Sequence, residues 1–390
     1  MEHATHVWAA HLAQRAGRIN DPVKRLRFLR RAAGSRPKAA RAADVGRRAG
    51  RIWIAPLLAV LLLSSAGTVS VAVPPVPAPL AGAQPPRTAA PPAPAWLVEQ
   101  HSGWELFSSG LRIETALAVR TQPRLYRPLA QSPVPGASVG FRTEPAGMVF
   151  HSSEGPLASF EPQQTGLLRR QGVDLLAYAR KHRLYHYVVD RFGRVHRLVE
   201  DSDVADHAGQ SVWADADAVY LNLNASFLGL AFEARTGPGA EAALTSAQIH
   251  SGKLLSEMLR HKYGIPAENC VTHAQVSVNP LNFHIGYHSD WARELPFSDL
   301  GLPDNYLQPP PSVCLFGFAY DRAFFEAAGT SLRAALLRAE EEVRHAAAAR
   351  SLNPARWRAE LNRRYRQAFS QVNTERAVLE KLAAREERHP

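Results

Sequence analysis

The sequence predicts an α/β fold in which a central mixed β-sheet is flanked by helices. Short apolar runs of strand length alternate with longer segments whose apolar residues recur at helical spacing. One pair of strand-like runs is joined by a short turn that ends in glycine, which makes part of the sheet antiparallel. With 390 residues, of which 46% are hydrophobic and 21% charged, the chain can bury a sizeable core and is not disordered throughout.

Each element of the body has a local signal. In chain order we expect a strand over 147–151, a helix over 167–182, strands over 185–189 and 194–199, a strand over 227–234, a helix from Thr245 to Gly264, and a strand ending at His273. Gly193 closes the turn between the paired strands, because glycine adopts the positive φ that tight hairpins need. Thr245 and Gln248 form a capping-box pattern that starts the second helix, and Gly264 is placed to end it.

The positive charge of the chain is confined to its N-terminus. Residues 1–51 contain 13 Lys and Arg against three acidic residues, so nearly all of the net charge of +11 lies there. The remaining residues are close to neutral and form no basic surface by composition. We therefore expect no nucleic-acid partner and interpret 1–51 as a basic cytoplasmic tail.

A membrane-inserting segment follows this tail. Residues 52–73 are 22 residues without a charge, enough for a transmembrane helix to cross a hydrocarbon core of about 30 Å. Arg47, Arg48 and Arg51 precede it and keep that end inside, so the body faces the periplasm and cell wall. We favour an uncleaved inner-membrane anchor, with a cleaved signal segment and a secreted body as the alternative because Ala81–Ala83 is a small-x-small site.

Proline-rich segments mark the two ends of the body of the chain. Residues 74–95 hold nine prolines and form an extended linker, the body covers 96–306, and a helical charged region covers 312–390. Within that C-terminal region we expect two helices separated at Pro354, with Asn353 as a cap. Its charged residues indicate a solvated face, and the sequence assigns it neither chemistry nor a partner.

Histidines concentrate in the body. Ten of the sixteen lie between His151 and His288, several of them at expected strand ends or in loops. A catalytic zinc site needs three protein ligands and one open position, which strand ends can supply. The body contains no His-Glu-x-x-His helix and neither a Gly-x-Ser-x-Gly nor a Walker glycine motif.

Six short motifs occur in a fixed order in this region. They are Val149–His151, Tyr185–Gly193, Asp206–Gly209, Asn224–Leu230, Thr245–Gln248 and Thr272–His273. In this order they resemble the zinc-dependent N-acetylmuramoyl-L-alanine amidases of the Amidase_2 family, which includes the peptidoglycan recognition proteins. The resemblance covers 147–291, somewhat over a third of the chain, and implies the mixed sheet flanked by helices.

The resemblance also implies an activity and a site. It implies a peptidoglycan hydrolase in which zinc-activated water cleaves the amide between MurNAc and L-alanine. The implied zinc ligands are His151, His273 and Asp290. Asn224 is implied to bind substrate, and His207 is implied either to contact substrate or to support a ligand without binding metal itself. His284 or His288 remains open as the third ligand in place of Asp290.

Two positions depart from the family pattern. His288 stands where the family has a lysine, and an imidazolium, or a neutral imidazole that donates a hydrogen bond, could stabilise an oxyanion in its place over a narrower pH range. Ala231 stands where one branch has a glutamate, so we expect Tyr185 to act in proton transfer, with Glu233 in reserve. The alternative function is a catalytically inactive peptidoglycan-binding module tethered to the membrane.

Overall fold

The computed structural model describes residues 91–131, 140–236 and 244–386, with side chains described as far as Thr374. The chain falls into two compact units, 1–66 and 67–390, and all described residues belong to the second. The predicted cytoplasmic tail, the membrane segment 52–73 and most of the linker 74–95 therefore lie outside the described residues. Within those residues, no helix is both long enough and apolar enough to cross a membrane.

The larger sheet of the described region contains eight strands. In their order across the sheet they are β1 (Leu97–Gln100), β2 (Trp104–Phe107), β3 (Arg112–Glu114), β7 (Val195–Arg197), β6 (Tyr187–Val189), β10 (Phe227–Phe232), β5 (Gly147–Ser152) and β11 (Cys270–Thr272). A smaller sheet has the order β4 (Leu129–Ala130), β9 (Ala218–Leu221) and β8 (Val212–Ala214).

The larger sheet is mixed, as predicted. Strands β6, β10, β5 and β11 run parallel, whereas β6 and β7 form an antiparallel hairpin. Gly193 in that hairpin has φ +78°, and a Cβ there would lie 2.6 Å from the carbonyl oxygen of Ala247, so only glycine fits. Because the four parallel strands end at the same edge, residues at their C-terminal ends are brought together.

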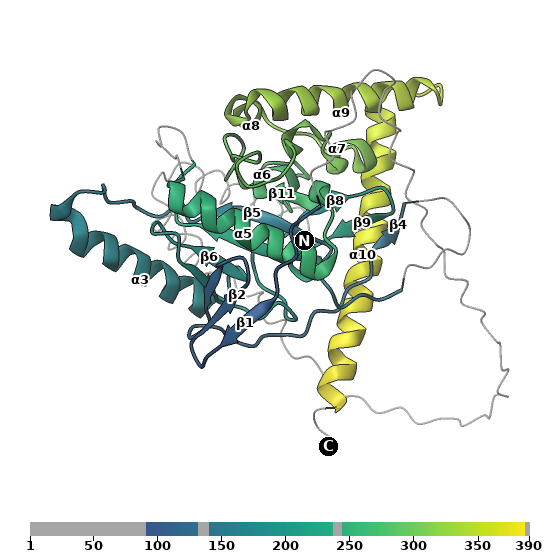
Figure 1. Cartoon of the computed structure of the whole chain (residues 1–390). Helices are drawn as coiled ribbons and strands as arrows, with labels where there is room; N and C mark the ends of the chain where they lie inside the picture. Colours follow the sequence, from purple (N-terminus) through teal and green to yellow (C-terminus); the bar gives the residue numbers. More distant parts are fainter. Residues whose placement is uncertain (1–90, 132–139, 237–243, 387–390) are drawn as a thin grey trace, which may run out of the picture. The chain divides into compact units, whose positions relative to one another are not determined.

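Helices cover both faces of this sheet (Figure 1). One face packs its apolar side chains, such as Phe150 and Phe232, against Leu255 and Met258 of α5 (Ser246–Tyr263). The other face packs against α3 (Thr165–His182). The short helical segments are η1 (Pro162–Gln164), α4 (Leu223–Ser226), η2 (Ala267–Asn269), α6 (His273–Val276) and η3 (Asn305–Leu307).

The C-terminal region is helical, and its helices share the core of the sheet. They are α7 (Pro311–Phe316), α8 (Arg322–Ala327), α9 (Thr330–Ala348) and α10 (Pro354–Glu386). Asn353 caps α10 by accepting the N–H of Arg356 at 2.8 Å, as predicted. Leu336 and Tyr365 are buried in the same cluster as Phe150 of β5, so the tail contributes apolar packing as well as a solvated face.

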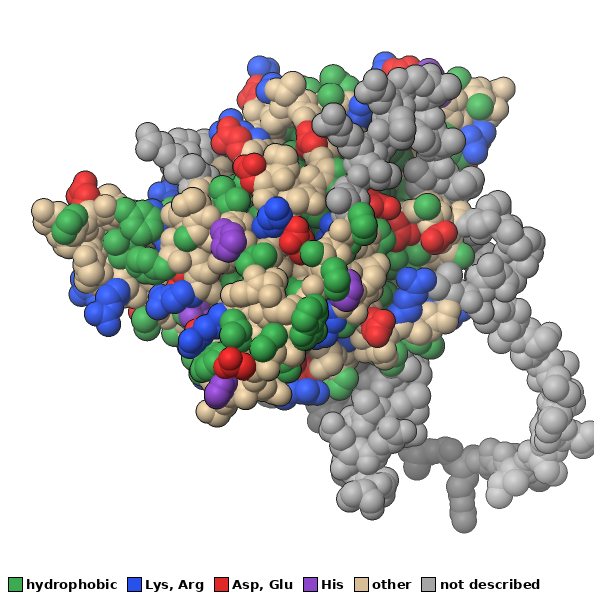
Figure 2. All heavy atoms as spheres, viewed as in Figure 1, with side chains coloured by type: hydrophobic (Ala, Val, Ile, Leu, Met, Phe, Trp, Pro, Cys, Tyr) green, Lys and Arg blue, Asp and Glu red, His purple; other side chains and the backbone are tan. Residues whose placement is uncertain are grey.

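The predicted elements are present with shifted ends. The capping box of Thr245 and Gln248 forms, and Gly264 ends α5 with φ +62°. The strand expected over 185–189 begins only at Tyr187, because Tyr185 has a left-handed backbone with φ +52° that cannot continue a ladder. Figure 2 shows acidic and basic side chains interspersed over the visible face of the described part.

Candidate metal centre

His151 occupies the C-terminal end of a buried central strand. It is the fifth residue of β5, and its side chain is 1% exposed. The parallel ladder aligns it with Ala231 of β10 on one side, and on the other side Phe150 aligns with Thr272 of β11. This register places His273, the residue after β11, beside His151, with the two ring centroids 4.5 Å apart.

Asp290 completes a group of three side chains. One of its oxygens lies 2.9 Å from Nδ1 of His273, and the other lies 3.4 Å from Nδ1 of His151. Its side chain is only 10% exposed. Ligand atoms of the three residues all lie within 4.8 Å of one another, which is the spacing of donors that share one metal ion.

His207 fixes the orientation of His151. Nε2 of His207 lies 3.2 Å from the carbonyl oxygen of Phe227, which can only accept, so this nitrogen carries the proton. Burial lowers the pKa of His207 well below its usual value, so the ring is neutral and its Nδ1 is an acceptor. That Nδ1 lies 3.1 Å from Nε2 of His151 and accepts its N–H. Nδ1 of His151 is therefore left as a bare lone pair that faces Asp290.

The position of His207 depends on a glycine in the neighbouring strand. A Cβ at Gly229 of β10 would lie 2.5 Å from the ring of His207, so the imidazole packs directly on the strand backbone. The turn that carries His207 is held by Asn224, whose side-chain oxygen accepts the N–H groups of His207, Ala208 and Gly209 at 2.6–3.2 Å. Asn224 thus builds the turn through its side-chain oxygen, and its contact with substrate stays a prediction.

The hydrogen bonds of His207 indicate what this side chain does. Both of its ring nitrogens are engaged within the protein, one with His151 and one with Phe227. It supports a neighbouring histidine and has no nitrogen left for substrate. Of the two roles predicted for His207, this geometry favours support of a ligand, through the orientation of His151.

At this site His151 is neutral and the carboxyl group of Asp290 is charged. Burial, with the neighbouring His273, lowers the pKa of His151 to about 4. Burial alone would raise the pKa of Asp290, but His273 and His151 outweigh it and hold that pKa well below its usual range. A carboxylate that faces the nitrogen of a neutral imidazole is the state in which these two groups bind a divalent metal.

Tyr185 lies against His151, and its part in proton transfer stays a prediction. Its ring centroid is 5.0 Å from that of His151. Burial, with the charges of Asp290, Tyr178 and Glu154, raises the pKa of its hydroxyl, so this group stays protonated and can donate a hydrogen bond.

His288 also lies at the site. Its ring stacks on His273 with centroids 4.5 Å apart and planes 16° apart. Burial and His273 lower the pKa of His288 to about 4, so it is a neutral imidazole at neutral pH. Its main chain is bonded twice by Ser277, whose hydroxyl accepts the His288 N–H at 3.0 Å and donates to its carbonyl oxygen at 3.1 Å.

Glu233 has different neighbours. It follows β10, and its carboxylate accepts the backbone N–H of Arg191 at 3.1 Å and lies against Gly172 of α3. These contacts occupy it on the α3 side of the strand end. His284, the other alternative ligand, pairs through its backbone with Ala319 in an isolated bridge.

Two residues of the site carried no recognisable sequence signal. Ser277 fixes the backbone of His288 from eleven residues away. Glu154 accepts from Thr236, whose hydroxyl in turn accepts the N–H of Trp291 at 3.2 Å, next to Asp290. In the sequence, a single serine or glutamate in a loop looks the same whether it fixes the backbone of a site residue or faces solvent.

The residues present fit a zinc ion. A bare nitrogen of His151 that faces a carboxylate at 3.4 Å needs a cation or a proton between them. In addition, Nε2 of His273 is buried and has no hydrogen-bond partner among the described residues, so the protein does not satisfy this ring by itself. Two imidazoles and one carboxylate are a donor set that zinc takes with a fourth position left open.

Part of the chain matches a known family. Residues 142–290 match the Amidase_2 model, described as N-acetylmuramoyl-L-alanine amidase, and this range ends at Asp290. No curated protein sequence is similar enough to count as a match.

The solved structures that are similar to part of this chain include two that are amidases by their titles. N-acetylmuramoyl-L-alanine amidase LysC from Clostridium intestinale URNW is 19% identical, over 40% of this chain and 83% of its own, with a TM-score of 0.26. AmiD from E. coli, in complex with a muramyl peptide substrate, is 18% identical over 51% and 65%, with a TM-score of 0.30. AMPDH3 from Pseudomonas aeruginosa, in complex with anhydromuramic pentapeptide, is 20% identical over 47% and 64%, with a TM-score of 0.28.

Proposed function

We propose that this protein is a zinc-dependent N-acetylmuramoyl-L-alanine amidase that cleaves the amide joining MurNAc to L-alanine in peptidoglycan. One observation carries the proposal. The buried group of His151, His273 and Asp290 lies within the residues that match the amidase family model. A shared donor set of this kind is the site that such hydrolysis needs.

Each residue of the site has a separate part in this proposal. His151, His273 and Asp290 would hold the zinc ion, which when bound lowers the pKa of water and polarises the carbonyl of the scissile amide. His207 keeps the ligating nitrogen of His151 unprotonated by accepting the proton on its other nitrogen. This hydrogen bond explains why a second buried histidine, His207, lies behind the ligand His151.

Two further side chains act on the substrate. His288, stacked on His273, donates a hydrogen bond from a neutral ring to the oxygen that becomes negative as the amide carbon turns tetrahedral. Tyr185 keeps its proton and donates to a second oxygen or to the departing nitrogen. Neither role needs a positive charge on the side chain. A lysine at the position of His288 would carry one.

The test is release of stem peptides. The purified full chain, incubated with purified sacculi and zinc, should release peptides with a free L-alanine amino group, and a chelator should stop the release. The His151→Ala protein is the matched control. Binding to sacculi without release by the zinc-loaded protein would establish the alternative, a catalytically inactive peptidoglycan-binding module.

We also propose that residues 52–73 anchor the protein in the inner membrane with the body in the periplasm. The support is the uncharged 22-residue run after an arginine-rich tail. The full-length chain should fractionate with the inner membrane and resist extraction by salt. A soluble form that begins near Gln84 would show that the segment is a cleaved signal.

A further inference from the structure

The residues between α6 and Trp291 form a loop that carries two members of the site. This ligand loop, residues 277–290, includes His288 and Asp290. It is cross-linked within itself, since Val278 bridges Ile285 and the N–H of Asn279 bonds to the carbonyl oxygen of His284 at 2.8 Å. Its placement over the site nevertheless requires contacts from outside the loop.

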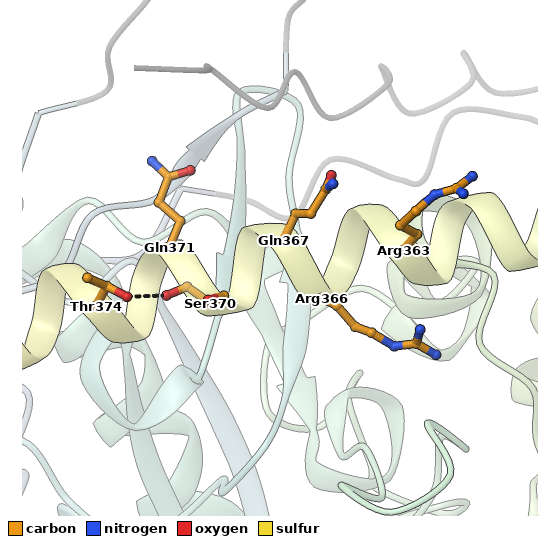
Figure 3. Close-up of a pocket in the computed structure, with 6 residues that line it drawn as sticks. All are labelled: Arg363, Arg366, Gln367, Ser370, Gln371 and Thr374. Atoms are coloured by element: carbon orange, nitrogen blue, oxygen red, sulfur yellow. Dashed lines mark hydrogen bonds between the residues drawn. The ribbon is translucent and has the colours of Figure 1, made fainter. Parts of the chain in front are cut away.

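The C-terminal helices supply aromatic contacts to the loop. The ring of Phe283 stacks on Phe318 with centroids 5.5 Å apart and meets Tyr365 of α10 edge-on at 5.6 Å. The guanidinium carbon of Arg366 lies 5.3 Å from the centre of the same ring. Figure 3 shows that Arg366 leaves α10 in a different direction from Arg363, Gln367 and Gln371.

The backbone of the loop is fixed by the same region. The N–H of Ile285 bonds to the carbonyl oxygen of Ala319, between α7 and α8, at 2.9 Å. Gly286 has φ +72°, and a Cβ there would lie 2.1 Å from the ring of Phe324 in α8, so the backbone rests directly on that ring. Two residues further on is His288.

Tyr365 also reaches the other half of the site. Its hydroxyl accepts a hydrogen bond from the side-chain nitrogen of Gln210 at 2.6 Å. Gln210 follows the turn that carries His207, and its carbonyl oxygen accepts the N–H of Val278 at the start of the ligand loop at 2.8 Å. One side chain of α10 therefore connects the ligand loop to the turn beside His151.

We propose that Tyr365 and Phe283 are positioning residues, through which the C-terminal helices hold His288 and Asp290 over the strand-borne histidines. The proposal rests on the proposed zinc site and extends it to Tyr365, which lies beyond the range that matches the family model. Tyr365 touches neither metal nor substrate. It acts through Phe283 and Gln210.

A purely stabilising role makes a different prediction. If α10 only adds buried apolar surface, every large truncation on its inner face should lower the melting temperature and leave the site unchanged. Trp357 provides the matched control, because it is an equally buried aromatic of α10 whose ring contacts Arg350 and Arg364. Its ring pairs with no residue of the ligand loop among the aromatic and cation contacts of the described residues.

The experiment compares Tyr365→Ala, Tyr365→Phe and Trp357→Ala in the full chain. Zinc affinity is measured by competition with a chelator, kcat and KM by peptide release, and amide hydrogen exchange over 277–290 without metal. Tyr365→Ala should weaken zinc binding and reduce kcat by about 10-fold or more, with faster exchange in the loop. Tyr365→Phe keeps the ring and should recover most of the zinc affinity and of kcat.

Trp357→Ala should lower the melting temperature by a similar amount and leave zinc affinity, kcat and loop exchange as in the wild type. Equal effects of Tyr365→Ala and Trp357→Ala on all three measurements would overturn the proposal. Should Tyr365→Ala fail to fold, Phe283→Ala removes the half-buried partner ring from the loop side and must show the same pattern. Loop exchange tests the positioning even if the wild type releases no peptide, so the two proposals fail separately.

Discussion

The two halves of the site are built in different ways. His151 and His273 stand at the ends of adjacent parallel strands, where register and burial fix them, with side chains 1% and 7% exposed. His288 and Asp290 stand on a loop. Ser277 bonds the main chain of His288, and Phe318, Phe324 and Tyr365 contact the loop at Phe283 and Gly286. The strand half should therefore tolerate distant changes, and the loop half should not.

Removing a strand-borne ligand tests the comparison most severely. His151→Ala or His273→Ala should abolish peptide release and lower bound zinc well below one equivalent, because a three-ligand site does not survive the loss of one ligand. Metal analysis of the purified proteins beside the release assay measures both effects. Full zinc occupancy in either variant would remove that histidine from the ligand group.

The loop-borne pair separates binding from chemistry. If His288 donates to the developing oxyanion, His288→Ala should cut kcat by about 10²–10³-fold while zinc content and KM hardly change. Asp290→Ala should instead lose the zinc. The opposite pattern, with zinc lost in His288→Ala and retained in Asp290→Ala, would make His288 the third ligand.

The donor at position 288 also predicts a pH profile. With its pKa lowered to about 4, His288 is neutral throughout the range from pH 6 to 8. Activity should therefore not fall across that range through deprotonation of this imidazole, and His288→Lys should not extend activity to higher pH. If kcat falls as the pH rises through about 6.5 and His288→Lys removes this fall, the imidazolium is the active form.

The histidine behind the strand half should have a smaller effect. His207→Ala removes the acceptor for the N–H of His151 and leaves space over Gly229. Loss of such an orienting partner lowers metal affinity by about 10–100-fold. Competition with a chelator measures this change, and unchanged affinity would mean that the bond to His207 does not set the ring of His151.

The smallest expected effect on activity comes from a carboxylate that supports the sheet. Asp201 accepts the hydroxyls of Tyr187 and Tyr263 and pairs with Lys262 at 3.0 Å. Burial raises its pKa, but Lys262 and Arg197 lower it more, to about 2. Because this folded pKa lies below the unfolded value of about 3.9, Asp201 contributes about 2–3 kcal/mol above pH 4, which is lost as the pH falls towards 2.

Asp201→Asn should therefore lower the free energy of unfolding at pH 7 and have much less effect near pH 2. Denaturant unfolding at both values measures the difference, and kcat at pH 7 should stay near that of the wild type. An equal loss of stability at both values would show that the charge of Asp201 contributes nothing.

Local patterns in the sequence determined most of the elements. The capping box at Thr245, the glycine at 193 and the cap at Asn353 appear where they were predicted, because each depends on residues within one turn of the chain. His151 and His273 also come together as expected, since strand ends of a parallel sheet meet at one edge, and Asp290 joins them from a loop.

Only the tertiary structure decided the remaining roles. Both nitrogens of His207 are engaged within the protein, and Asn224 builds its turn, which a motif alone does not distinguish from contact with substrate. Glu233 turns to Arg191 and α3, and the C-terminal helices reach the site through Tyr365. These outcomes depend on packing between residues far apart in sequence, and periodicity or spacing along one segment carries no information about which distant side chain will meet it.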